Sequence, residues 1–272
     1  MKNTKHMLSA LLLLVLAFPL KAARVDTVDV YSAAMNKKVP AVVIVPERAI
    51  VGNRCPVVYL LHGYSDNHRN WVARKPDLKR HADEKGIFIV CPDGNNSWYW
   101  DSPVDPTFRY ETFVSKELVE YVDKYYSTVP RPKGRAVTGL SMGGQGALFL
   151  AIHHPEVFGA AGSMSGGVDI RPFPKNWDMA KRLGSFEENR QVWEEFTLVN
   201  QMERFKAANL SLIIDCGTED FFFQVNCDLH KRLLENGVKH DFIVRPGAHT
   251  WDYWISSVEF QLLFFQQFFE RL

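Results

Sequence analysis

Short apolar segments alternate with longer segments of helical periodicity along most of this 272-residue chain. The short segments are rich in Val, Ile and Leu and are bounded by Gly, Pro or Asp, as buried strands commonly are. The longer segments repeat apolar residues every three or four positions, as helices with one buried face do. This alternation predicts an α/β fold with a mostly parallel central sheet flanked by helices. We expect strands at 39–45, 56–61, 87–90, 135–139, 158–163, 210–215 and 241–244, and helices at 112–126, 142–153, near 223–235 and at 251–269.

Residues 166–206 interrupt this alternation with a stretch rich in Pro, Trp and charged residues. We expect an excursion over one end of the sheet, not a separate domain. The last predicted helix, 251–269, has a polar face that includes Ser256, Glu259 and Gln266 and is not basic. A helix that lies on a membrane surface has a basic polar face, so packing against the core is favoured for this one.

The N-terminus has the features of a signal peptide. Lys2 and Lys5 precede an apolar run at 8–18, and the small residues Ala22 and Ala23 follow. The run is too short for a membrane span, which needs roughly 20 apolar residues. We therefore predict a signal peptide at 1–22 and a single mature domain at 23–272, located in the periplasm or secreted without stable membrane insertion. An uncleaved anchor is the alternative.

Composition and charge narrow the classes of function. Hydrophobic residues make up 46% and charged residues 23% of the chain, which is ordinary for a globular protein. The formal net charge is +1, from 32 Lys and Arg against 31 Asp and Glu. Without a basic excess to neutralise phosphates, nucleic-acid binding has little support. Oligomeric state is not indicated by the sequence.

The four cysteines show neither a CxxC motif nor the spacing of a metal site. No bound metal is expected. An exported protein can form disulfides, and the pair closest in sequence is Cys216 with Cys227. Buried free thiols in or beside strands are the favoured interpretation for all four, which also include Cys55 and Cys91.

The clearest chemical motif is Gly139-Leu140-Ser141-Met142-Gly143, which fits the pattern GxSxG. A predicted strand precedes it and a helix rich in small residues follows it, as a nucleophilic serine on a tight strand-to-helix turn requires. Glycines two residues to either side let the backbone pack closely. Ser141 also lies at a helix N-terminus, where N–H groups favour developing negative charge.

A nucleophilic serine needs a general base and an acid that orients the base, and in this fold they follow the serine in the order acid, then histidine. His249 lies between the last predicted strand and the last helix, where it can reach Ser141. The acid is expected after the preceding strand, where Asp215, Glu219 and Asp220 are the carboxylates. Asp215 is expected to lie within the strand, and spacing alone does not choose between Glu219 and Asp220.

Two further sets of residues are expected near the serine. The tetrahedral intermediate needs two backbone N–H donors, for which Met142 and Tyr64 are the candidates. Tyr64 follows His62-Gly63 at a predicted strand end, where a structural role suits His62. Trp98 and Tyr99 follow another predicted strand at the same end of the sheet, and they are candidates for binding substrate. Core packing is the equally weighted alternative for these two aromatic residues.

Together these motifs resemble the esterase D / putative esterase family of the α/β-hydrolases, which includes feruloyl and acetyl-xylan esterases, S-formylglutathione hydrolases and the antigen 85 mycolyltransferases. The resemblance implies an α/β-hydrolase fold, no cofactor, and Asp220 as the acid, since it is the last residue of Gly-Thr-x-Asp. It extends from about Val25 onward, although region 166–206 varies within the family. The residues that carry it are Leu60-Leu61-His62-Gly63, Asn96-Ser97-Trp98-Tyr99, Asp101-Ser102-Pro103, Gly139-Leu140-Ser141-Met142-Gly143-Gly144, Gly217-Thr218-Glu219-Asp220 and Gly247-Ala248-His249.

With export, this resemblance predicts a serine esterase that removes feruloyl or acetyl groups from plant polysaccharides, so its expected partner is an acylated poly- or oligosaccharide. Two alternatives belong to other classes: an acyltransferase of the antigen 85 kind, and a carbohydrate-binding protein without catalysis. An S-formylglutathione hydrolase is disfavoured, because the predicted signal peptide takes the chain away from cytosolic glutathione.

Overall fold

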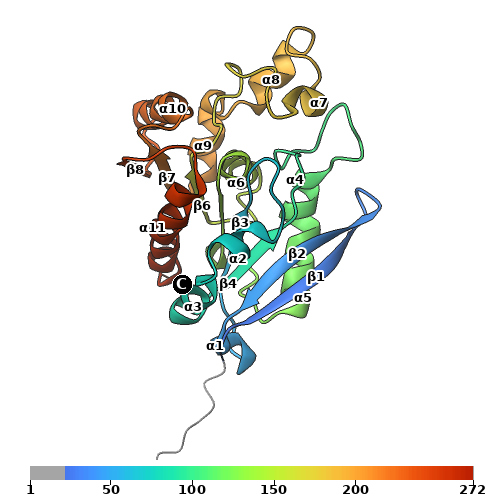
Figure 1. The fold of residues 1–272 in the computed structure, drawn as a ribbon, viewed down its shortest axis with the longest axis vertical. Coiled ribbons are helices and arrows are strands. Elements are labelled where there is room, and N and C mark those ends of the chain that lie inside the picture. The colour runs from blue at the N-terminus through green and yellow to red at the C-terminus, as the bar shows by residue number, and fades with distance from the viewer. Residues whose placement is uncertain (1–21, 272) are drawn as a thin grey trace, which may run out of the picture.

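The computed structural model describes residues 22–271, and within them eight strands form one sheet (Figure 1). The predicted signal peptide lies almost wholly outside these residues. The sheet order is β1-β2-β4-β3-β5-β6-β7-β8. Strands β1 and β2 are antiparallel to their neighbours, whereas β4, β3, β5, β6, β7 and β8 are parallel. The strands are β1 (Arg24–Ser32), β2 (Lys37–Val45), β3 (Val57–Leu61), β4 (Phe88–Pro92), β5 (Arg135–Gly139), β6 (Ala160–Met164), β7 (Ser211–Gly217) and β8 (Asp241–Arg245).

The helices cover both faces of the sheet, so the predicted fold class of a mostly parallel α/β sheet is confirmed. Side chains of α3 and α11 pack on one face and those of α5, α6 and α10 on the other. The α-helices are α1 (Glu47–Ile50), α2 (Asn70–Arg74), α3 (Leu78–Lys85), α4 (Tyr110–Thr112), α5 (Leu118–Tyr125), α6 (Met142–His153), α7 (Met179–Leu183), α8 (Arg190–Phe196), α9 (Met202–Ala208), α10 (Phe223–Glu235) and α11 (Trp251–Phe269). A π-helical turn, η1 (Phe113–Glu117), joins α4 to α5, and η2 (Pro132–Gly134) and η3 (Leu198–Asn200) are 3₁₀ turns.

The alternation of side chains along β3 shows how the two cores form. Val57, Tyr59 and Leu61 enter the core beneath α5 and α6, while Val58 and Leu60 enter the core beneath α3 and α11. All five are buried, because helices cover both faces. This explains why the central strands lack the polar–apolar alternation of a half-exposed sheet.

Two regions differ from the sequence-based expectation in detail. Strand β1 was not predicted, because as an edge strand it carries exposed polar side chains between its apolar ones. The predicted helix at 112–126 is divided into α4, η1 and α5. The excursion at 166–206 contains α7, α8, η3 and the beginning of α9. Figure 1 shows α7 and α8 at the top of the molecule, beyond the ends of the strands.

Helix α11 has the predicted bounds and packs against the sheet through residues such as Trp254, Val258 and Leu262. Among the helices of residues 22–271, none combines the length and apolar character needed to cross a bilayer. All four cysteines are free thiols in this part of the chain, and Cys227 is the one that is not fully buried.

Strand order explains which loops meet at one end of the sheet. Strands β3 and β5 are neighbours, and Leu61 pairs with Gly139 at their carboxyl ends. Strands β7 and β8 are also neighbours, and Gly217 pairs with Arg245 at theirs. The loops that follow these four strands therefore converge at one edge. After β4 the chain returns to the other side of β3 to form β5, so the strand order reverses between β3 and β5. Such a reversal is where α/β sheets commonly form a crevice.

Candidate active site

Ser141 lies on a sharp turn between β5 and α6. Its backbone has φ 54° and ψ −117°, a conformation that residues other than glycine rarely adopt. Its N–H donates to the carbonyl oxygen of Met164 at 2.9 Å, which holds the turn against β6. The two flanking glycines are sterically required. A Cβ on Gly139 would lie 2.7 Å from the carbonyl of Gly143, and one on Gly143 would lie 2.6 Å from the carbonyl oxygen of His62.

The structure brings Ser141, His249 and Asp220 into one hydrogen-bonded chain. Nε2 of His249 lies 2.9 Å from Oγ of Ser141. On the other side of the ring, Nδ1 lies 2.8 and 3.0 Å from the two carboxylate oxygens of Asp220. The Asp220 side chain is fully buried and also accepts the N–H of Phe222 at 2.8 Å. Because the carboxylate accepts the Nδ1 proton, Nε2 is the nitrogen available to accept a proton from the serine.

The three carboxylates that spacing left as possible acids have different surroundings. Asp215 lies in β7 and faces α11, where it accepts hydrogen bonds from Tyr253 and Ser257 and pairs with Arg245. Burial raises the pKa of the Asp215 carboxyl.

Glu219 is exposed and turns toward the backbone of the histidine loop. Its carboxylate accepts the N–H of Gly247 and the hydroxyl of Thr218. The Thr218 hydroxyl and the Gly247 N–H lower the pKa of Glu219. Of the three, Asp220 is the carboxylate in contact with His249.

Tyr64 and Met142, the candidates for the oxyanion hole, are in the two loops that meet at Ser141. A Cβ on Gly63 would lie 3.5 Å from Cβ of Ser141, so the peptide that carries the Tyr64 N–H is next to the nucleophile. Within residues 22–271, the N–H groups of Tyr64 and Met142 donate to no protein acceptor. Two such donors at the nucleophile are suited to binding an oxyanion.

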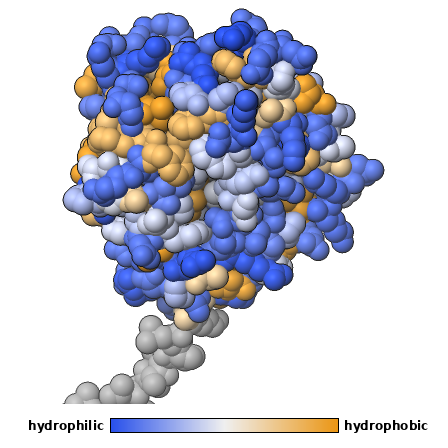
Figure 2. Space-filling model, turned by 45° about the horizontal axis from the view of Figure 1, so that its top comes forward, coloured by the Kyte–Doolittle hydropathy of each residue, from blue (hydrophilic) through white to orange (hydrophobic). Residues whose placement is uncertain are grey.

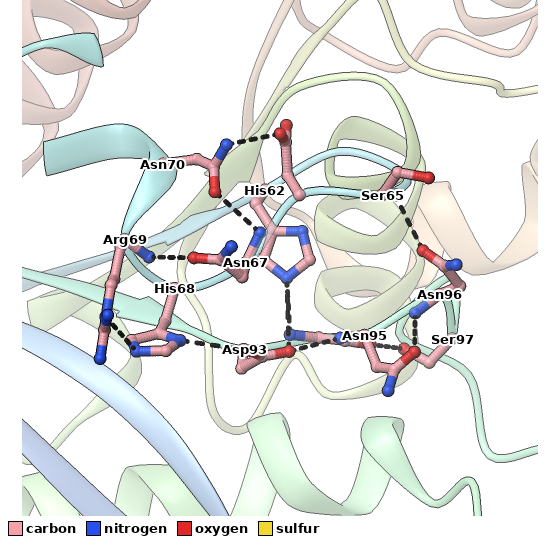
Figure 3. A network of polar contacts seen from close by, with 12 residues as sticks. His62, Ser65, Asn67, His68, Arg69, Asn70, Asp93, Asn95, Asn96 and Ser97 are labelled. Carbon is pink, nitrogen blue, oxygen red and sulfur yellow. Dashed lines mark hydrogen bonds and ion pairs between the residues drawn. The ribbon is translucent and has the colours of Figure 1, made fainter. Parts of the chain in front are cut away.

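The buried His62 ring fixes the Gly63–Tyr64 peptide, and Figure 3 shows His62 within a network of polar contacts that joins the loops after β3 and β4. Nδ1 of His62 donates to the carbonyl oxygen of Gly63 at 2.7 Å, and Nε2 of His62 accepts the N–H of Gly94 at 2.8 Å. That carbonyl belongs to the same planar peptide as the Tyr64 N–H, so holding the oxygen also fixes the direction of the N–H. Because Nε2 accepts a hydrogen bond and Nδ1 faces a carbonyl oxygen, these contacts fit the neutral ring with its proton on Nδ1. Burial lowers the pKa of His62, which favours the same neutral form.

The loop after β4 holds the next peptide of the chain, which joins Tyr64 to Ser65. Figure 3 shows Asn96 beside Ser65, and the Asn96 side-chain oxygen accepts the Ser65 N–H at 2.9 Å. Asp93 begins this loop and lies 3.2 Å from Nδ1 of His68. The loops after β3 and β4 are thus joined by polar contacts on both sides of His62.

Trp98 and Tyr99 are not on the open surface of the site. Their exposed fractions are 1% and 0%. The Tyr99 hydroxyl accepts the N–H of His62 at 3.0 Å and lies 3.1 Å from its carbonyl oxygen, to which it donates. Nε1 of Trp98 donates to the carbonyl oxygen of Trp177 at 3.0 Å. Their burial does not support the prediction that these residues contact substrate; both support neighbouring loops from beneath.

The exposed aromatic surface at the site comes from residues that sequence reasoning did not assign to it. Phe221 is 52% exposed and its ring centroid lies 4.2 Å from that of His249. Trp177, from the excursion, stacks on Phe221 at 5.6 Å with an interplanar angle of 15°. The position of Phe221 directly after the acid was a usable signal. No sequence pattern links Trp177 to this loop.

One group of metal-ligating side chains lies elsewhere in the fold. Asp77, His81 and Glu259 have ligand atoms within 4.8 Å of one another. The Lys75 ammonium already lies between the carboxylates, 2.5 Å from Glu259 and 3.0 Å from Asp77. This cation compensates their charge, so the residues present do not favour a metal ion.

Comparison with known proteins gives relatives across nearly the whole chain. The model of the family described as "Putative esterase" matches residues 32–265. An acetyl esterase from Caldicellulosiruptor saccharolyticus is 25% identical over 251 residues, which cover 84% of this chain and 92% of the relative. The diacylglycerol acyltransferase/mycolyltransferase Ag85A from Mycobacterium gordonae is 31% identical over 280 residues, which cover 89% and 80%.

A solved structure of a ferulic acid esterase superposes with a TM-score of 0.79 and 28% identity. The alignment covers 91% of this chain and 99% of that one. The residues that the family model matches, 32–265, span all the loops that form the site described above.

Proposed function

The chain belongs to the "Putative esterase" family, and from this premise we propose that it is an exported serine esterase that removes feruloyl or acetyl groups from plant polysaccharides. Its reaction class is carboxylic ester hydrolysis. The single observation that carries the mechanism is the hydrogen-bonded chain from Asp220 through His249 to Ser141.

In the first half of the reaction, Ser141 Oγ attacks the ester carbonyl carbon and its proton passes to Nε2 of His249. The carbonyl oxygen becomes an oxyanion, which accepts the N–H groups of Tyr64 and Met142. The carbon–oxygen bond to the alcohol then breaks, and the alcohol leaves with the proton from Nε2. Asp220 holds the ring and stabilises the imidazolium that exists between the two proton transfers.

In the second half, water attacks the acyl-serine and gives a proton to Nε2 of His249. The bond between the acyl carbon and Oγ breaks, and the proton from Nε2 returns to Ser141. The carboxylic acid leaves and the enzyme regains its starting state. Each proton therefore moves along a single hydrogen bond of Nε2. The other atom of that bond is Oγ of Ser141, the oxygen of the departing alcohol or the oxygen of the attacking water.

The finer parts of the proposal have separate support. A signal-peptide pattern at 1–22 supports export. The names of the acetyl esterase and ferulic acid esterase relatives support the two acyl groups. Export is tested by N-terminal sequencing of protein from the periplasm or medium, with a mature end after Ala22 as the expected result. A full-length chain there contradicts cleavage.

Acyl transfer is the second candidate, because the Ag85A relative is 31% identical and named as an acyltransferase. In that reaction a sugar hydroxyl takes the place of water in the second half. The two functions are separated by product analysis at increasing concentrations of a sugar acceptor. Hydrolysis gives free acid at every concentration, whereas transfer gives a new sugar ester that grows with the acceptor.

The decisive experiment compares wild type with Ser141→Ala on methyl ferulate, acetylated xylan and a p-nitrophenyl acetate reporter. We expect Ser141→Ala to lower turnover about 10⁴- to 10⁶-fold, because the triad acts as a unit. Retention of most of the activity would sink the mechanism. Serine-dependent release of ferulate assigns the feruloyl function, and serine-dependent release of acetate alone assigns deacetylation.

A further inference from the structure

Beside the histidine, the exposed ring of Phe221 and the half-buried ring of Trp177 stack on each other, and together we call them the aromatic platform. The two rings are nearly parallel, and Phe221 contacts the imidazole of His249. Figure 2, which brings the top of the molecule in Figure 1 toward the viewer, shows apolar residues gathered in one area of a mostly polar face. Aromatic side chains commonly line the sites that bind small molecules, and this pair lies next to the imidazole of the site.

The platform is held in place by contacts on both sides of Ser141. Trp177 packs against Phe222, at 5.3 Å between ring centroids, and its carbonyl oxygen accepts the Nε1–H of buried Trp98. The next residue, Asp178, accepts the hydroxyl of Tyr64 at 3.0 Å. The excursion is therefore joined to the loop after β3 and to the loop after β7 at once. Trp177 and Asp178 have φ values of 48° and 56°, which are strained for residues other than glycine. The contacts above stabilise this backbone conformation.

The chemistry decides which part of a substrate can reach the platform. Nε2 of His249 must come within hydrogen-bond distance of the departing oxygen in order to protonate it. The first atoms of the alcohol portion therefore lie beside the imidazole, and Phe221 is the exposed ring in contact with that imidazole. The Tyr64 and Met142 N–H groups hold the carbonyl oxygen and so mark the other side of the reacting carbon.

We propose that Trp177 and Phe221 bind the sugar ring of the alcohol portion by stacking on its apolar C–H face. The face of an aromatic ring is negative and attracts C–H groups, while the sugar hydroxyls at the ring edge stay in water. This inference rests on the proposed function and adds to it a site for the neutral sugar that leaves. It makes the excursion the element that distinguishes a sugar ester from a simple alkyl ester.

The test uses four esters that combine two acyl groups with two alcohols: methyl acetate, methyl ferulate, an acetylated xylose and a feruloylated arabinose. Wild type is compared with Trp177→Ala, Phe221→Ala and Trp177→Phe. The matched control is Tyr125→Ala, which removes an aromatic ring of 60% exposure from the last residue of α5, a helix that contributes no side chain to the site described above. We expect Tyr125→Ala to match wild type on all four esters.

We expect Trp177→Ala and Phe221→Ala to lower kcat/KM for each sugar ester about tenfold relative to the methyl ester of the same acid, mainly through KM. Trp177→Phe retains a flat ring and is expected to restore most of that ratio. Three results overturn the proposal: a loss that follows ferulate with either alcohol, an equal loss on all four esters, and unchanged ratios. Failure of the proposed function looks different, because wild type would then hydrolyse none of the esters in a Ser141-dependent way.

Discussion

The loops on the two sides of Ser141 are held by different kinds of contact, buried on one side and exposed to solvent on the other. On the side of the oxyanion donors, the ring of His62 holds the Gly63–Tyr64 peptide, and Tyr99 holds the backbone of His62; both side chains are buried. On the side of the base, the backbone of the histidine loop is held at Gly247 by Glu219, which is exposed. Hydrogen bonds in a buried network are strengthened by the low local dielectric, whereas an exposed carboxylate competes with water.

This difference corresponds to what each side does in the reaction. Backbone N–H donors help catalysis only when they already point at the developing oxyanion, so any freedom in the peptide lowers their value. His249 must form hydrogen bonds with the serine, the departing alcohol and water in turn. Its orientation comes from the buried Asp220 carboxylate, and Glu219 needs only to hold the loop backbone near it. In the proposed mechanism, the buried carboxylate of Asp220 therefore has the catalytic role, and the exposed carboxylate of Glu219 supports the loop.

The largest effect is expected when the two neighbouring carboxylates, Asp220 and Glu219, are each replaced by an amide, because this tests their different roles directly. We expect Asp220→Asn to lower kcat about 10⁴-fold, because an amide favours the wrong tautomer of His249 and does not stabilise its charged form. Esterase kinetics with p-nitrophenyl acetate measure the loss. The matched control is Glu219→Gln, for which we expect less than about a tenfold loss, since an exposed brace contributes little. If Glu219→Gln is the more damaging change, the assignment of Asp220 as the acid fails.

On the other side, His62→Ala is expected to lower kcat about 10²- to 10³-fold with a smaller change in KM, because the Tyr64 N–H loses its fixed direction. His62→Gln offers both a donor and an acceptor in place of the imidazole, so we expect it to recover part of kcat. Stopped-flow or steady-state kinetics separate the two parameters. A large rise in KM with kcat preserved would contradict the positioning role.

The same histidine gives a pH dependence of stability with a definite sign. Burial lowers the pKa of folded His62 below its ordinary value of 6.5, so unfolding takes up a proton in the pH range between the two values. His62 therefore costs stability as the pH falls below about 6.5. In thermal unfolding from pH 7 to pH 5, His62→Gln is expected to lose less of its Tm than wild type. A steeper loss in the variant would contradict a neutral His62.

The smallest change is Tyr99→Phe, which removes one hydroxyl from beneath the oxyanion loop. The N–H and carbonyl of His62 both lose a partner in the buried interior, and we expect the free energy of unfolding to fall by about 1–3 kcal/mol. A shift of the peptide would also lower kcat, by about tenfold or less. Denaturant unfolding measures the first effect. Tyr125→Phe, at an exposed tyrosine, is the control, and an equal effect of both changes would contradict the brace.

How far local sequence rules reach is clear from particular residues. The turn at Ser141 follows from neighbours in the chain: glycines at 139 and 143, a strand before and a helix after. Helix α11 follows in the same way from apolar spacing, and its bounds were predicted. The roles of Trp98 and Tyr99 were harder to predict. The sequence identifies an aromatic side chain, but it does not show whether other loops cover that side chain. Strand β1 was missed because only its pairing with β2 makes it a strand.

Three features could be predicted from the sequence alone: the class of the fold, the turn that presents Ser141, and the order along the chain of the serine, the acid and the histidine. These depend on local periodicity, steric limits and spacing, which act between near neighbours. Spacing left Glu219 and Asp220 open as the acid, and the family resemblance implied Asp220. The tertiary structure shows Asp220 in contact with His249, Glu219 and Asp215 directed elsewhere, and Trp177 stacked on Phe221. These contacts join residues that lie 28 to 44 positions apart in the sequence. They depend on strand order and on which side chains the packed loops leave exposed, and neither is encoded in a short window of sequence.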